Sequence, residues 1–266
     1  MKTHTENNRN GFGSYVEVNG LPMYYEIHGE GSALVLIHGG GSTIETNFGK
    51  LIPLLSARHK IIAMELQAHG RTPDREAGLT FEQDADDVAA LLKAIGINKA
   101  NFFGFSNGAT TTLQIAIRHP QLVSKMILGS PVAKRSGLYP WFWDFIAGAR
   151  LDNMPQELQD GYLKLTNDPA GLQQMHDRDV TRMINFTDIP DELVSAIKLP
   201  AMIVIGDRDV VRPEYAVALQ QQIAGSRLAI IPGTHGEYIG EITTISKDFR
   251  ETDMIVPIIE KFLEQG

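Results

Sequence analysis

Short apolar runs alternate with amphipathic stretches along most of this chain. The continuous apolar character of six runs is typical of strands that are covered on both faces, as in a parallel sheet. The six predicted strands are residues 33–39, 59–66, 99–105, 124–131, 201–207 and 226–233. Before them, residues 14–18 and 21–29 flank an Asn19-Gly20 pair and predict a β-hairpin.

Helical patterns fill the spaces between these strands. Residues 81–96 follow Thr80, which is a typical N-cap residue, and end at a glycine. Residues 214–225 follow a proline and also end at a glycine, and residues 251–264 form a last predicted helix. Because strands and helices alternate, we expect an α/β fold with a mostly parallel central sheet and helices on both faces.

One long segment interrupts the alternation. Residues 132–198 contain helical stretches and loops but no convincing strand, and they hold both tryptophans of the chain. We interpret this segment as a small helical cap over the sheet. The predicted organisation is a flexible N-terminus at 1–13, a core at 14–131 and 199–264, and the cap at 132–198.

Composition and charge narrow the range of possible functions. The chain has 266 residues, a net charge of −8 and no cysteine. The acidic balance argues against nucleic acid and anionic membrane surfaces as partners, and the lack of cysteine excludes disulfides and thiolate metal sites. The polar first residues do not resemble a signal peptide, and no apolar run reaches membrane-spanning length, so we expect a cytoplasmic protein.

The sequence GFSNG at 104–108 lies between a predicted strand and a predicted helix. A serine at such a turn, with glycines on both sides, can be held in a strained conformation that exposes its hydroxyl group. The same pattern could be a glycine-rich turn with an incidental serine. Its position after a strand and before a helix favours Ser106 as a nucleophile.

A serine nucleophile needs a base, and the base needs an orienting carboxylate. His235 lies in a loop just after the last apolar run, at the edge of the sheet where open α/β folds place their ligands. Asp207 and Asp209 both follow the preceding strand, and we favour Asp209 because it lies further beyond the strand end.

The sequence HGGG at 38–41 follows the first predicted strand of the central sheet. Acyl transfer requires hydrogen-bond donors for an oxyanion, and we expect the N–H groups of Gly40 and Asn107 to supply them. A triple glycine could also cradle a phosphate, but the chain has neither a GxGxxG motif nor a Walker lysine. No cofactor or metal is predicted.

The aromatic residues of the cap cluster in YPWFWDF at 139–145. Most of them are expected to pack the cap onto the sheet. One or two could line an apolar substrate pocket, for which the candidates are Trp141, Phe142 and Trp143.

Taken together, these motifs resemble those of the α/β-hydrolase superfamily over residues 14–264. They occur in the order typical of that family: HGGG (38–41), AHGRT (68–72), GFSNG (104–108), GDRD (206–209) and then His235. The resemblance implies Ser106 as nucleophile, His235 as base, Asp209 as orienting acid and structural roles for His38 and His69. The chain is similar to the branch of small-ester and lactone hydrolases that includes the valacyclovirase-like group.

The resemblance therefore implies a serine hydrolase that cleaves a small carboxylic ester or lactone through an acyl-enzyme. A carbon–carbon bond hydrolase or an acyltransferase of the same fold stays an alternative. A third alternative is a protein that binds a small molecule without turning it over. The sequence does not predict the substrate, the oligomeric state or the role of residues 236–249.

Overall fold

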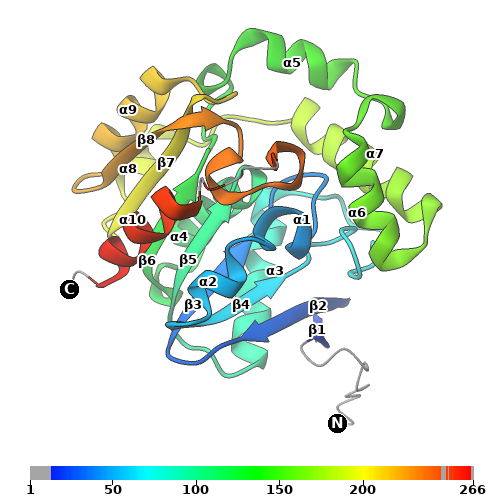
Figure 1. The fold of residues 1–266 in the computed structure, drawn as a ribbon, viewed down its shortest axis with the longest axis horizontal. Coiled ribbons are helices and arrows are strands. Elements are labelled where there is room, and N and C mark those ends of the chain that lie inside the picture. Colours follow the sequence, from blue (N-terminus) through cyan, green and yellow to red (C-terminus); the bar gives the residue numbers. More distant parts are fainter. Residues whose placement is uncertain (1–12, 247–249, 251, 265–266) are drawn as a thin grey trace.

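The computed structural model describes residues 13–246, 250 and 252–264, and these contain an eight-stranded sheet (Figure 1). Its strand order is β1-β2-β4-β3-β5-β6-β7-β8. The hairpin strands β1 and β2 are antiparallel, and β3 to β8 are parallel. The strands are β1 Gly13–Val18, β2 Leu21–His28, β3 Ser32–Ile37, β4 His59–Met64, β5 Ala100–Phe105, β6 Val123–Gly129, β7 Ala201–Arg208 and β8 Arg227–Thr234.

The hairpin and the six predicted strands are confirmed, with ends shifted by one or two residues. Alternate side chains of the parallel strands enter different cores, as the twofold period of a strand requires. In β3, Val35 and Ile37 join the core on one face, whereas Leu34 and Leu36 join the core on the other. This explains the continuous apolar runs in the sequence. The predicted N-terminal segment lies outside the described residues except for Gly13, which begins β1.

Helices cover both faces of the sheet. Residues of α3, α4 and α9 share one core, and residues of α1, α2 and α10 share the other. Thr80 caps α3 as expected, because its side chain accepts a hydrogen bond from the N–H of Gln83. The helix bounds are α1 Ile44–Phe48, α2 Ile52–Leu55, α3 Phe81–Ala94, α4 Asn107–Arg118, α9 Pro213–Gln222 and α10 Thr252–Glu264.

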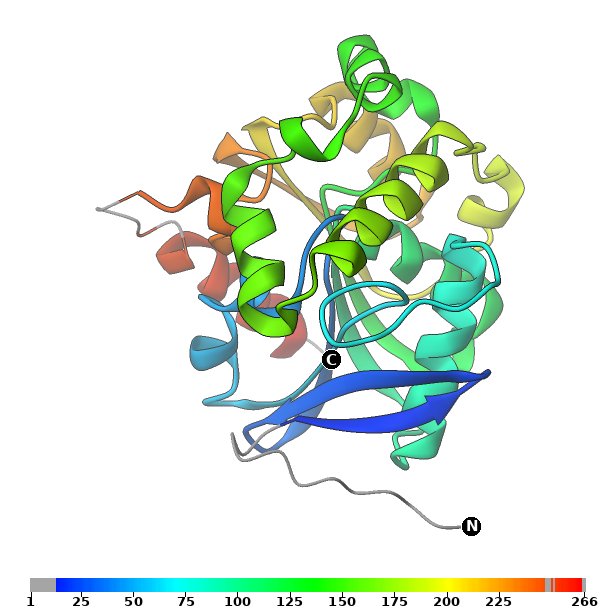
Figure 2. The same cartoon turned by 90° about the vertical axis from the view of Figure 1, so that its right-hand side faces the viewer.

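The segment between β6 and β7 is helical. It contains α5 Pro140–Ala147, α6 Gln156–Thr166, α7 Pro169–Ile184 and α8 Asp191–Ser195. Helices α6 and α7 lie to one side of the sheet in Figure 1 and in front of it in Figure 2, and α6 contacts α1. Tyr162, Leu172 and Met175 form a small core between α6 and α7. In contrast, Val194 of α8 packs into the core of the sheet.

Five short 3-10 helices complete the described structure: η1 Pro120–Leu122, η2 Arg135–Gly137, η3 Leu151–Asn153, η4 Glu237–Ile239 and η5 Ile242–Thr244. Among the described helices, none has the length and apolar character needed to cross a bilayer.

Candidate active site

Ser106 lies at the sharp turn from β5 to α4. Its backbone has φ 53° and ψ −119°, a conformation that L-residues rarely adopt. A Cβ atom on Gly104 would lie 2.1 Å from the carbonyl oxygen of Gly108, and one on Gly108 would lie 2.1 Å from that of Ile37. Both glycines are therefore required for the close approach of strand and helix, and the turn is a built feature rather than a loose loop.

The structure brings Ser106, His235 and Asp209 together from three strand ends. The Oγ of Ser106 is 3.2 Å from Nε2 of His235, and Nδ1 of His235 is 2.7 Å from Oδ1 of Asp209. When Nδ1–H donates to Asp209, Nε2 is free to accept the serine proton. Burial lowers the pKa of His235, but the charge of Asp209 and the hydrogen bond that His235 donates to it outweigh burial and raise this pKa above 6.5.

Asp209 is buried and surrounded by donors. Its Oδ2 accepts hydrogen bonds from the Ser130 hydroxyl at 2.6 Å and from the Gly206 N–H at 3.2 Å, and its Oδ1 accepts from the Val211 N–H at 3.1 Å. Burial raises its pKa, but the charge of His235 and the hydrogen bonds to the carboxylate lower it further, so the pKa lies below 3.8. Asp207, the competing candidate, is half exposed and accepts from the N–H of Gly233 instead.

Ser130 and Tyr238 support this carboxylate, and sequence reasoning missed both. The Ser130 hydroxyl is 2.9 Å from the Tyr238 hydroxyl, and both side chains are buried. Tyr238 belongs to η4, so part of the segment 236–249 lies directly behind Asp209. The signal in the sequence was weak, because Ser130 occurs where the apolar run of β6 ends without an acidic residue.

The N–H groups of Gly40 and Asn107 have no hydrogen-bond acceptor within the described residues, and both residues line the cavity that contains Ser106. A Cβ atom on Gly40 would lie 2.5 Å from Nδ2 of Asn107, so the two residues are neighbours. Asn107 is also the first residue of α4, where the helix dipole favours negative charge. Two unengaged donors beside the serine form a suitable place for an oxyanion.

His38 fixes the peptide that carries the Gly40 N–H. Its Nδ1–H donates to the carbonyl oxygen of Gly39 at 2.8 Å, and its Nε2 accepts from the N–H of Leu66 at 3.0 Å. Burial and the neighbouring His69 lower the pKa of His38 to about 3. His38 is therefore neutral at ordinary pH, and this single tautomer orients the Gly39–Gly40 peptide.

Asp179 of the cap helix α7 reaches the same loop. Its Oδ2 accepts from the Gly41 N–H at 2.5 Å and from Nε2 of His69 at 2.8 Å, and its Oδ1 accepts from Arg182 at 2.5 Å. Arg182 in turn donates to Asp84 of α3 at 2.7 Å. Burial raises the pKa of Asp179, but His69 and Arg182 hold it well below its usual value. This chain of contacts ties the cap to the glycine loop.

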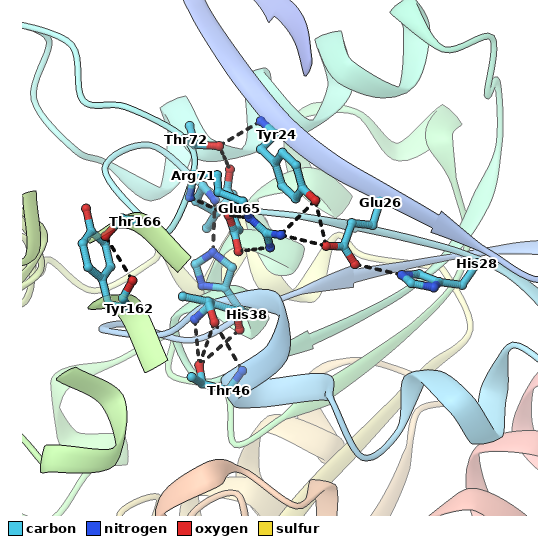
Figure 3. A network of polar contacts seen from close by, with 12 residues as sticks. Tyr24, Glu26, His28, His38, Thr46, Glu65, Arg71, Thr72, Tyr162 and Thr166 are labelled. Atoms are coloured by element: carbon cyan, nitrogen blue, oxygen red, sulfur yellow. Dashed lines mark hydrogen bonds and ion pairs between the residues drawn. The ribbon is translucent and has the colours of Figure 1, made fainter. Parts of the chain in front are cut away.

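The loop that carries His69 is itself anchored to the hairpin. Figure 3 shows Arg71 paired with the buried Glu65, with its guanidinium over the ring of Tyr24. The Thr72 hydroxyl accepts from the N–H of Tyr24 and donates to the carbonyl oxygen of Glu65. These contacts of the AHGRT motif hold the loop that carries His69 in place. The family resemblance likewise implies a structural role for His69.

A cavity of about 220 Å³ lies between the cap and Ser106. Of the three predicted pocket residues, Phe142 lines it, together with Phe145 from the same helix. The prediction is wrong for Trp141, which is 54% exposed, and for Trp143. The indole of Trp143 stacks on Phe186 and donates to a backbone carbonyl oxygen, because the helical turn points it away from the cavity.

No group of three His, Asp or Glu side chains within the described residues is arranged to hold a metal ion. The polar groups that line the cavity include the serine, the imidazole of His235 and the two N–H groups described above. This set can carry out acyl transfer at a carbonyl carbon without an added cofactor.

The family model for the alpha/beta hydrolase fold matches residues 32–174, more than half of the chain. This chain belongs to the alpha/beta hydrolase fold family. It is similar to the serine hydrolase BPHL of Homo sapiens, with 28% identity over 253 residues that cover 88% of this chain and 84% of that protein.

Solved structures resemble this alpha/beta hydrolase along nearly its whole length. One is a meta-cleavage product hydrolase from Pseudomonas fluorescens, with a TM-score of 0.78, 20% identity and coverage of 95% of this chain and 97% of that one. Another is the enol-lactonase from Burkholderia xenovorans, with a TM-score of 0.73, 21% identity and coverage of 94% and 100%. At this identity the likeness establishes the shared fold.

Proposed function

We propose that this protein is a serine hydrolase that cleaves a small, uncharged carboxylic ester or lactone through an acyl-enzyme. The observation that carries the proposal is the series of contacts from Ser106 through His235 to Asp209, beside two N–H donors without an acceptor among the described residues. The similarity to a serine hydrolase over most of the chain supports it.

In the proposed reaction, Ser106 attacks the acyl carbonyl while His235 accepts its proton. The N–H groups of Gly40 and Asn107 stabilise the oxyanion, and Asp209 stabilises the imidazolium. His235 then protonates the leaving alcohol, and water releases the acyl group by the same route.

The cavity lining supports an uncharged substrate. Asp179 lines the cavity, and no lysine or arginine does so within the described residues. The charge of Asp179 is already balanced by Arg182 and His69, and most of the remaining wall is apolar, with Phe142, Phe145 and their neighbours. A substrate carboxylate would lose its water here without gaining a cationic partner.

The cavity lining and the strained serine also bear on the alternative functions. A carbon–carbon bond hydrolase acting on a carboxylate-bearing diketone would need a cation that the described lining lacks. An acyltransferase shares the first half of the proposed cycle and differs in the acceptor. A non-catalytic binding protein would not need the strained serine.

The test is a panel of neutral esters, lactones and carboxylate-bearing vinylogous diketones, assayed with wild type and Ser106→Ala. We expect hydrolysis of neutral esters or lactones that Ser106→Ala abolishes while circular dichroism stays unchanged. A fluorophosphonate probe should label the wild type at Ser106. Undiminished turnover in Ser106→Ala, or a folded wild type that is neither labelled nor active, would overturn the proposal.

A further inference from the structure

Helix α7 places four side chains over the cavity of Ser106 at helical spacing: His176, Asp179, Val180 and Met183. Val180 and Met183 are apolar, and both oxygens of Asp179 are engaged with the protein. His176 differs from the other three. Of these four residues, it is the one whose side chain has a polar atom, Nε2, that no group of the described residues bonds.

His176 is 92% buried, since its exposed fraction is 8%. Its Nδ1–H donates to Asp177 at 2.9 Å, and no group of the described residues bonds its Nε2. With Nδ1 protonated, the neutral ring presents Nε2 as an acceptor. Nε2 is not sealed from solvent, so a ligand or water in the cavity can reach it and supply a donor.

Two cavities meet at His176. The inner one contains Ser106 and measures about 220 Å³; the second lies on the outside of the cap and measures about 580 Å³. Ala149 and His176 line both. The inner cavity is smaller than the roughly 300–1,000 Å³ typical of small-molecule sites, so a larger substrate would extend beyond it. The shared lining at Ala149 and His176, called the opening below, is where such a substrate would pass into the outer cavity.

The outer cavity has a different chemistry from the inner one. Its lining includes Arg150, Asp152, Gln159, Gln173 and Asp177, whereas aromatic and aliphatic side chains dominate the inner wall. Arg150 and Asp152 pair with each other at 3.1 Å. Asp177 Oδ1 already accepts from Gln173 and His176. Among the contacts of the described residues, Asp177 Oδ2 and the amide oxygens of Gln159 and Gln173 remain for a ligand that donates hydrogen bonds.

We propose that the outer cavity is a subsite for the far end of the substrate, and that His176 accepts a hydrogen bond from a hydroxyl or amide N–H group there. This inference rests on the hydrolase function proposed above and narrows its substrate class. The substrate is an ester or lactone with a compact apolar part at the scissile carbonyl and a polar, donor-bearing tail. The tail extends past Ala149 to the surface of the cap.

Matched pairs of substrates test whether a polar tail increases the rate of hydrolysis. Ethyl butanoate is compared with glyceryl monobutanoate, which places hydroxyls on the alcohol side. Methyl hexanoate is compared with methyl 6-hydroxyhexanoate, which places a hydroxyl on the acyl side. We expect wild type to prefer the hydroxylated member of one pair by about 2- to 10-fold in kcat/KM, the value of one hydrogen bond.

Two variants test the residues. His176→Leu should abolish this preference, so the readout is the ratio of kcat/KM for the hydroxylated ester to kcat/KM for its plain partner, which should fall to about 1. Ala149→Trp should close the opening and lower hydrolysis of the hydroxylated ester at least tenfold. Its matched control is Ala147→Trp, since Ala147 is exposed and lines neither cavity.

Equal losses on short and hydroxylated esters in His176→Leu and Ala149→Trp, or no change on either, would overturn the subsite. Binding measured by calorimetry in the Ser106→Ala background separates this inference from the hydrolase proposal, because it needs no turnover. If that protein binds glyceryl monobutanoate and methyl 6-hydroxyhexanoate no better than their plain partners, the subsite is refuted. If the His176-dependent difference in binding persists while wild type hydrolyses none of the esters, the hydrolase proposal fails and the subsite stands.

Discussion

Replacing Asp179 by asparagine is the most informative perturbation of this site, because that carboxylate joins the cap to the glycine loop. It accepts hydrogen bonds from the Gly41 N–H, from His69 and from Arg182. Asparagine keeps the size of the side chain and one oxygen. It removes the negative charge and turns its NH₂ group toward at least one donor.

The expected loss of stability follows from these contacts. A hydrogen bond to a charged group contributes about 1.5–3 kcal/mol, and breaking a buried ion pair costs roughly 3–5 kcal/mol. Arg182 keeps its second partner, Asp84, at 2.7 Å. We therefore expect Asp179→Asn to lower the free energy of unfolding at pH 7 by about 3 kcal/mol, measured by urea denaturation.

The expected loss of activity follows from the position of Gly41, which comes directly after the proposed donor Gly40. Losing one oxyanion donor outright lowers kcat by about 10²- to 10³-fold. A displaced loop weakens this donor without removing it, so only part of that effect is expected. We expect kcat of Asp179→Asn on a neutral ester to fall about 10- to 100-fold, with a smaller change in KM.

Asp84→Asn is the matched control. It weakens the other end of the same chain of contacts without touching the glycine loop, so it should lower stability and leave kcat near the wild-type value. If both variants lose stability and both keep kcat, Asp179 serves only to anchor the cap and the positioning argument is refuted.

The pH dependence of stability gives a second check on Asp179. Its pKa in the folded protein is held well below the ordinary value near 3.9. A lowered acid pKa contributes stability above the unfolded value, and this contribution is lost as pH falls below it. The stability difference between wild type and Asp179→Asn should thus shrink below about pH 4, and a constant difference down to pH 2 would contradict the assigned charge.

Three further predictions concern the proposed base, the carboxylate beside it and the pocket. The acid limb of the kcat/KM profile should lie above pH 6.5, because Asp209 raises the pKa of His235 and only the neutral imidazole accepts the proton; a limb at or below 6.5 would disagree. Ser130→Ala should lower kcat about tenfold by removing one charge-assisted hydrogen bond, measured beside an unchanged far-ultraviolet spectrum. Phe142→Ala should raise KM for an apolar ester about fivefold or more through lost apolar contact, whereas exposed Trp141→Ala should leave KM unchanged.

Much of the fold could be predicted from local pattern. The apolar runs gave the six central strands because a doubly covered parallel strand must be apolar on both sides. The short helices α1 and α2 were missed, since stretches of four or five residues carry too little periodicity. The spacing of GFSNG, GDRD and His235 relative to strand ends indicated the proposed nucleophile, acid and base.

The residues that sequence reasoning missed act across long separations. Ser130 supports Asp209 from 79 positions away, and Asp179 reaches Gly41 across 138 positions. Neither belongs to a motif, because a serine after a strand and an aspartate in a polar helix are ordinary residues. Trp141 and Trp143 were predicted to line the pocket and do not. The face of α5 that meets the cavity depends on how the cap packs, which the local sequence does not determine.

The sequence by itself thus determined the strands, their order along the chain and the chemical groups at their ends, because each depends on neighbours a few residues apart. Tertiary structure alone decided which donors hold Asp209, how the cap carboxylate reaches the glycine loop and where His176 meets two cavities. Those contacts arise when separate elements pack together, and their geometry is fixed by that packing rather than by local pattern.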